Sequence, residues 1–207
     1  MKGLILKDIL NLRKQFKTTL LVIGFFAIYA YGTNNPSYML SMVTLIFAMM
    51  PITAMAFDDM SKWDRYALAM PISRKSIVAS KYILSICLSL VSIVISFFIS
   101  YLVILPRTDI TGKELLLIAY LVFYTSLVFA SIVLVFIYKY GVERARVISL
   151  GIFVLPMMVG LGIYKAGFKP PSKEQLMLLL KISPILLVLI LLGSALVSYR
   201  IYKNKDI

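Results

Sequence analysis

The sequence predicts an all-α integral membrane protein: six transmembrane helices, an N-terminal amphipathic interfacial helix, and a short cytoplasmic helix between spans two and three. Of its 207 residues, 61% are hydrophobic and 15% are charged, whereas soluble domains carry about 25% charged residues. Six long runs are almost free of charge, and a bilayer core of about 30 Å needs about 20 apolar residues per helix. The basic residues gather at alternate ends of these runs. We therefore expect residues 1–207 to form a single transmembrane domain.

Residues 2–17 form a basic arm before the first apolar run. Its apolar residues recur at helical spacing and are opposed by polar ones, which predicts an amphipathic helix on the inner leaflet. The predicted apolar face consists of Ile5, Ile9, Leu12 and Phe16. No small-x-small cleavage site follows, so a signal peptide is disfavoured. A basic arm that only sets topology remains an alternative.

Uncharged runs predict the six spans in order. The first two, at about 16–32 and 38–57, are separated by the turn sequence Gly-Thr-Asn-Asn-Pro-Ser. The later spans are expected at 77–105, 114–138, 146–164 and 175–199. Helix breakers occur inside three of these spans, where bending would help a moving protein, although such residues are common in membrane helices. The possible kinks are Pro51, Pro156, Gly160, Gly162 and Pro184.

The distribution of Lys and Arg predicts the orientation. Sixteen of the 22 basic residues fall in the arm, in the loops after spans two and four, and in the tail, and six fall on the other side. Both termini are therefore expected in the cytoplasm. This asymmetry also explains the net charge of +13, so no nucleic acid partner is needed.

The sequence offers no chemistry of its own. It has no His, its single Cys lies in an apolar run, and none of its nine acids falls within a span. Imidazole catalysis, His-ligated metals and an intramembrane proton relay are thereby disfavoured. Gly162 and Gly167 precede Lys169, but the phosphate-loop ending Gly-Lys-Ser/Thr is missing. We therefore expect no catalytic, cofactor-binding or metal-binding residue, and no enzyme activity in this chain.

The cytoplasmic segment 58–76 carries the only Trp of the chain. Ser61 and Asp64 predict a capping box that opens a short helix. Trp63, Tyr66, Ala67 and Met70 then recur at i, i+3, i+4 and i+7, which predicts one apolar-aromatic stripe. Pro71 is expected to stop this helix, and Ser73 to cap the next one, which begins at Arg74 and continues into span three. The stripe would suit a helix resting at the membrane surface or one that docks a protein.

The same segment carries a family resemblance. The pattern Trp63-x-x-Tyr66, followed by Met-Pro-Ile-Ser-Arg-Lys at 70–75 and by Ser-Lys-Tyr at 80–82, resembles the first cytoplasmic loop of ABC-2 type permeases. More narrowly, the chain is similar to the small six-span permeases of bacterial phenol-soluble modulin and antimicrobial peptide exporters. One departure is the modest loop 165–175, where such exporters carry short re-entrant helices.

The resemblance implies specific roles. Residues 2–17 would be an elbow helix, and 58–76 a coupling segment that docks a separate ABC ATPase subunit, which binds ATP and Mg. The implied docking residues are Ser61, Trp63, Asp64, Arg65, Tyr66, Met70, Pro71, Ser73 and Arg74. A second permease subunit would complete an exporter in the bacterial cytoplasmic membrane, moving an amphipathic peptide or hydrophobic substrate outward. An immunity factor or a sensor anchor would share the hydropathy. A secondary transporter is disfavoured by the missing intramembrane acids.

Overall fold

The computed structural model describes residues 2–70, 72–104, 106, 108, 110–165 and 173–204; within these ranges a few side chains are outside the description. Every regular element in this part of the chain is helical. The helices are α1 Lys2–Leu12, α2 Phe16–Gly32, α3 Pro36–Met60, α4 Trp63–Ala69, α5 Arg74–Ile99, α6 Gly112–Tyr140, α7 Val142–Lys165 and α8 Lys173–Lys203. A 3-10 turn, Arg13–Gln15, joins α1 to α2, and a π-helical turn, Ser100–Ile104, extends α5.

Four helical stretches among the described residues are long and apolar enough to cross a membrane. They are Pro36–Met60, Arg74–Leu102, Gly112–Tyr140 and Met177–Lys203. The all-α membrane class is thereby supported. α2, which has 17 residues, and α7 do not meet the same criterion within the described residues. The six-span layout therefore remains a prediction.

Local signals explain where several helices begin and end. α2 ends at Gly32, and the Asn35 side chain accepts a hydrogen bond from the Ser37 amide at the start of α3, so the predicted turn between the two helices is present. Thr111 and Glu114 form a reciprocal capping box at the start of α6. Gly141 has φ +83° between α6 and α7, a conformation that favours glycine.

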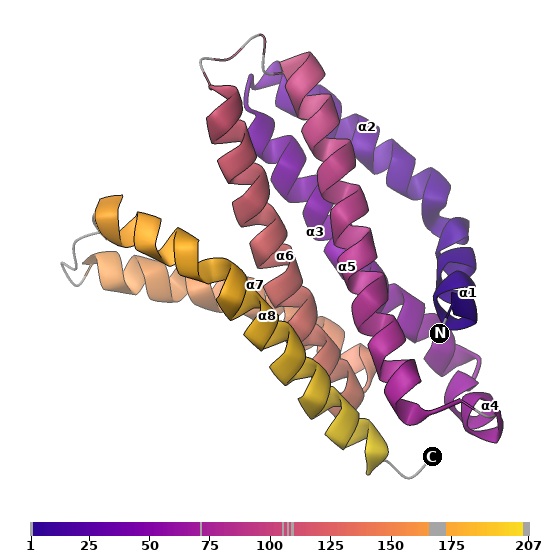
Figure 1. The fold of residues 1–207 in the computed structure, drawn as a ribbon. Helices are drawn as coiled ribbons and strands as arrows, with labels where there is room; N and C mark the ends of the chain where they lie inside the picture. The colour runs from indigo at the N-terminus through magenta and orange to yellow at the C-terminus, as the bar shows by residue number, and fades with distance from the viewer. Residues whose placement is uncertain are drawn as a thin grey trace.

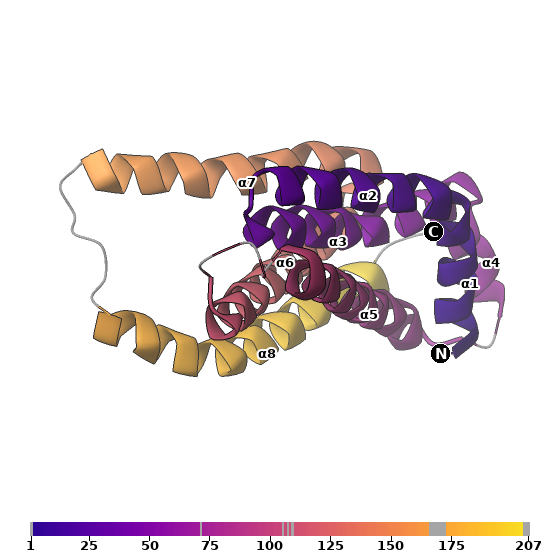
Figure 2. The same cartoon turned by 90° about the horizontal axis from the view of Figure 1, so that it is seen from above.

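The long helices pack into a bundle whose centre is formed by α3, α5 and α6 (Figure 1). α2 packs on α3, while α7 and α8 both pack on α6. α1 crosses one end of the bundle, where α4 and the last turns of α8 also lie (Figures 1 and 2). One end of the molecule thus collects segments that are far apart in the sequence.

Serines line the buried face of α5. Ser85, Ser89, Ser92 and Ser96 recur at intervals of three or four residues, and each is at most 3% exposed. Small side chains on one face allow neighbouring helix backbones to approach closely in a membrane protein. Three of these hydroxyls donate to carbonyls of α5 itself. The serine face therefore serves to pack α5 against the bundle.

The largest apolar cluster joins α4 to the bundle. It contains Ala67 of α4, Ile77 and Tyr82 of α5, Tyr138 of α6 and Tyr202 of α8, with Trp63 packed against it. Burying apolar surface contributes roughly 25 cal/mol per Å². α4 is therefore held to the bundle by packing as well as by the two loops that flank it.

Candidate functional site

The short helix α4 and the polar contacts that hold it form the candidate site. Before α4, Lys62 adopts a left-handed conformation with φ 52°. The Ser61 hydroxyl donates backward to the carbonyl oxygens of Phe57, at 2.9 Å, and Asp58, at 3.2 Å. The predicted capping box of Ser61 and Asp64 is therefore wrong, because α3 continues to Met60 and makes Ser61 its own C-cap.

The predicted stripe on α4 is divided between two faces. Ala67 is fully buried and Trp63 is half-buried against the apolar cluster. Tyr66 is 63% exposed and Met70 is 44% exposed. Met70 leaves the helical register because α4 ends at Ala69 and Met70 itself is extended, with ψ 157°. The expectation of one continuous stripe was therefore wrong: Trp63 packs inward and Tyr66 faces outward.

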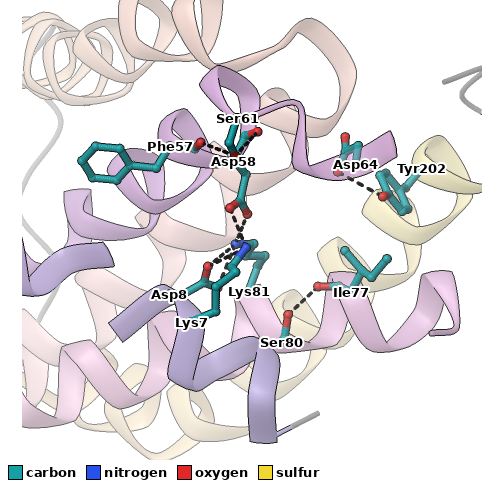
Figure 3. A network of polar contacts seen from close by, with 10 residues as sticks. All are labelled: Lys7, Asp8, Phe57, Asp58, Ser61, Asp64, Ile77, Ser80, Lys81 and Tyr202. Carbon is teal, nitrogen blue, oxygen red and sulfur yellow. Dashed lines mark hydrogen bonds and ion pairs between the residues drawn. The ribbon is translucent and has the colours of Figure 1, made fainter. Parts of the chain in front are cut away.

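A buried ion cluster of Lys7, Asp8, Asp58 and Lys81 lies beside α4 (Figure 3). The Lys81 ammonium contacts both carboxylate oxygens of Asp8 at 2.8 Å and one oxygen of Asp58 at 2.6 Å. Lys7 reaches Asp58 at 2.5 Å and Asp8 at 3.2 Å. The side chains of Asp8 and Lys81 are 1% and 4% exposed. Two cations and two anions make the cluster formally neutral, the arrangement that a buried charge requires.

The ion cluster fastens three helices together. Lys7 and Asp8 come from α1, Asp58 from the end of α3, and Lys81 from the second turn of α5. Removing one partner from such a group leaves a buried charge uncompensated, at a cost of about 3–5 kcal/mol. The cavity beside Asp58 and Lys81 measures about 30 Å³, far below the roughly 300 Å³ of a small-molecule site. The geometry thus suits a fixed connection between three helices rather than a substrate site.

Lys7 also connects the cluster to α4. Its ammonium lies 4.3 Å from the centre of the Trp63 ring, within the range of a cation–π interaction. α1 therefore contacts the inner face of α4 through the same side chain that pairs with Asp58.

A second set of contacts joins α4 and the start of α5 to the end of α8. The Tyr202 hydroxyl donates to the Asp64 carboxylate at 3.2 Å, as Figure 3 shows. The Arg74 guanidinium donates to the backbone carbonyls of Tyr202, at 3.2 Å, and Lys203, where a helix C-terminus attracts cations. Ser73 accepts from the Ser76 amide at 3.2 Å, so its predicted role as the N-cap of α5 is confirmed.

The elbow residues divide differently from the prediction. α1 covers Lys2–Leu12, and Phe16 already belongs to α2. The buried face of α1 consists of Leu4, Asp8 and Leu12, because the ion cluster draws Asp8 inward. Ile5 is half-buried, whereas Ile9 and Phe16 are exposed. The apolar face proposed from the sequence is thus only partly the one that contacts the bundle.

The remaining residues singled out from the sequence are Arg65, Pro71 and the predicted kinks. Arg65 is exposed on α4. Pro51 lies buried inside α3, Pro184 lies inside α8, and Gly162 is exposed on α7. Pro71 and loop residues 166–172 lie outside the described residues, as does the burial of Pro156 and Gly160 within α7. Whether these positions act as kinks remains a prediction.

Sequence reasoning missed the ion cluster and Tyr202. A signal for one member was available: Asp8 is the only acid of the arm and shares a helical face with Leu4 and Leu12 at intervals of four. Nothing local marked Asp58, Lys81 or Tyr202 as partners, since they are 23 to 138 residues from the groups they contact. Within the described residues, no group of three or more His, Cys, Asp or Glu side chains could hold a metal.

Comparison with known proteins identifies the family of this chain. The family model described as "ABC-2 family transporter protein" matches residues 3–203. No curated protein and no solved structure gives a significant match. Permeases of this family are membrane subunits of ABC transporters and work with an ABC ATPase partner. Because the match spans nearly the whole chain, the protein belongs to the ABC-2 transporter family.

Proposed function

We propose that this chain is the permease subunit of an ABC exporter and that α4 is its coupling helix, which docks the ATPase. The observation that carries the proposal is the two-sided character of α4. Its inner side is bonded to α1 and α8, while its outer side presents Tyr66 and Met70. Family membership favours transport over a non-transporting anchor or immunity role.

A permease that binds no nucleotide can receive work only through contact with its ATPase. A partner shifts a two-state equilibrium only if it makes different contacts with the two states. A coupling helix must therefore be exposed to the partner and firmly attached to the spans it moves. α4 meets both requirements, since its inner contacts reach α1, α3, α5 and α8 either directly or through the ion cluster.

We assign the docking surface to the exposed residues of α4 and of the two segments that flank it. These are Met60, Ser61, Lys62, Arg65, Tyr66 and Met70. Tyr66, a large aromatic at 63% exposure, is the expected anchor, because aromatic residues and Arg dominate the binding energy of interfaces. Trp63 and Asp64 instead attach α4 to the bundle, while Ser73 caps α5 and Arg74 bonds the end of α8.

The complete exporter would contain two permease and two ATPase subunits and would release an amphipathic peptide or hydrophobic substrate from a bacterial cytoplasmic membrane. The most apolar window of α8 has no residue buried within this chain, which supports a covering by lipid or by the second permease. The basic residues support cytoplasmic termini, because positive loops remain on that side. α4 lies at the same end of the bundle as α1 (Figure 1), as coupling to a cytoplasmic ATPase requires.

The test is the substitution Tyr66→Asp. A carboxylate in a desolvated contact should cost at least about 2 kcal/mol, or about thirtyfold in ATPase affinity. Co-purification of the ATPase and export should both fall, while the melting temperature of the isolated permease stays near that of the wild type, since Tyr66 is exposed.

Tyr101→Asp is the matched control. It places the same new charge on a tyrosine that is 51% exposed, in the π-helical turn at the far end of α5 from α4. If both variants retain the ATPase equally well and still support export, α4 is only a helix resting on the membrane surface.

A further inference from the structure

A long apolar groove lies at the elbow between α1 and α2, on the side facing α3 and α5. We call it the elbow groove. Its volume is about 420 Å³, and its walls include Ile9 of α1, Phe16 and Leu20 of α2, Phe47 of α3 and Val91 of α5. Aliphatic and aromatic side chains make up nearly all of its surface, with Arg13 as the charged residue of the lining. This volume falls in the range of ligand sites.

The groove runs to more than half the depth of a bilayer. Of its lining residues, Phe47 precedes Asp58 by eleven residues on α3, and Ile95 follows Lys81 by fourteen residues on α5, which correspond to about 16 Å and 21 Å along the two helices. The hydrocarbon core is about 30 Å thick. The groove therefore reaches at least the depth of one leaflet, which is the length available to a single acyl chain.

The mouth of the groove is basic. Arg13 lies in the turn between α1 and α2, and Lys14 and Lys17 follow it, all three exposed. None of them forms an ion pair with a carboxylate among the residues that the structure describes. Asp8, the only acid of the arm, is already paired with Lys81. Lys14 lies 5.9 Å from the centre of the Phe57 ring, so Arg13 and Lys17 are the charges left to attract an anion.

We propose that the elbow groove binds one anionic phospholipid, with an acyl chain along the groove and the phosphate at Arg13. With the predicted topology this lipid comes from the cytoplasmic leaflet, whose anionic lipids attract juxtamembrane basic residues. The bound lipid would fill the space between α1, α2, α3 and α5 and so fix the angle of the elbow helix. This site shares no residue with the proposed ATPase-docking surface, which is formed by α4 and the residues that flank it.

A second copy of the chain fits the groove less well. A two-fold contact centred on the groove would bring the same patch of both copies together. Arg13, Lys14 and Lys17 of one copy would then approach their equivalents, and like charges brought together at an interface cost several kcal/mol. An anionic headgroup instead neutralises them.

The test measures lipid binding to the purified permease in detergent by native mass spectrometry. Phosphatidylglycerol and phosphatidylcholine with the same acyl chains are titrated separately. Phosphatidylglycerol should bind more tightly to the wild type, and Arg13→Gln should weaken its binding about fivefold, the effect of about one basic residue near a lipid surface. Binding of phosphatidylcholine should not change in this variant.

Two tryptophan variants test the groove itself. Leu20→Trp fills it and should reduce the binding of both lipids, whereas Leu21→Trp adds the same side chain to a position that is 75% exposed and should change neither. Equal binding of the two lipids to the wild type, or an unchanged affinity in Arg13→Gln, would overturn the proposal even if Leu20→Trp failed to fold. So would efficient disulfide-linked dimers through Leu20→Cys in a Cys87→Ser background, because a second copy would then cover the groove.

Discussion

Lys81→Met tests whether the ion cluster holds α1 to the bundle. Methionine keeps an unbranched side chain but removes the ammonium, which makes three contacts of 2.6 to 2.8 Å with Asp8 and Asp58. Only Lys7 would remain to balance two carboxylates, and it approaches Asp8 at 3.2 Å. The Asp8 carboxylate, with its side chain 1% exposed, has almost no access to water.

The expected loss follows from that burial. Breaking a buried pair by removing one partner costs about 3–5 kcal/mol. For a chain of 150–250 residues each kcal/mol lowers the melting temperature by about 2–4 °C, so the variant should melt on the order of 10 °C below the wild type. Lys75→Met, the same substitution at an exposed position of α5, should cost less than about 1 kcal/mol, since exposed charges contribute little.

The assay is thermal unfolding of the purified permease in detergent, with hydrogen exchange of α1 as a local readout. Adding Asp8→Asn to Lys81→Met removes the unpaired anion and leaves Lys7 paired with Asp58, so the double variant should regain at least half of the lost stability. If Lys81→Met melts within 2 °C of the wild type, or if the double variant is no more stable than the single one, the ion cluster does not hold α1 to the bundle.

Three further predictions address the supports of α4, the start of α5 and the topology. Tyr202→Phe should lower the stability by about 1.5 kcal/mol, because it removes a hydrogen bond to the Asp64 carboxylate, and hydrogen exchange should quicken in α4; unchanged exchange there would contradict the link. Ser73→Ala should cost about 1 kcal/mol by removing the cap of α5, and Ser73→Asp should restore it. A reporter fused after Ile207 should be active in the cytoplasm, and activity only outside the cell would reverse the predicted topology.

Local features of the fold could be predicted well. The turn between α2 and α3 and the Ser73 cap depend on residues within a few positions of one another, so the sequence pattern is sufficient. The capping box failed because the end of α3 was placed at the first charged residues, whereas Asp58 and Asp59 continue the helix to Met60. A helix can extend past the end of its uncharged run when tertiary contacts neutralise the charged residues that follow. Lys7 and Lys81 do this for Asp58.

The candidate site could be predicted only in outline. The periodicity identified a short helix with aromatic residues but not which of them faces the bundle. Successive residues on a helix are about 100° apart, so Tyr66 and Ala67 on adjacent positions point in different directions, and the packing of Ala67 decides that Tyr66 faces outward. The ion cluster joins positions 8, 58 and 81, and a pairing over such separations has no period that a single sequence could reveal.

The residues of the ion cluster lie far apart in the sequence, and this separation has a consequence for folding during synthesis on the ribosome. Asp8 and Asp58 emerge before Lys81, which contacts both of them, and chains grow from the N-terminus at about 5–20 residues per second. Until Lys81 emerges, Lys7 is the only cation of the cluster available to the two carboxylates, and α1 has no partner on α5 to receive it. Complete docking of α1 therefore waits for the third long helix, and the contact of α4 with Tyr202 waits until α8 has been synthesised.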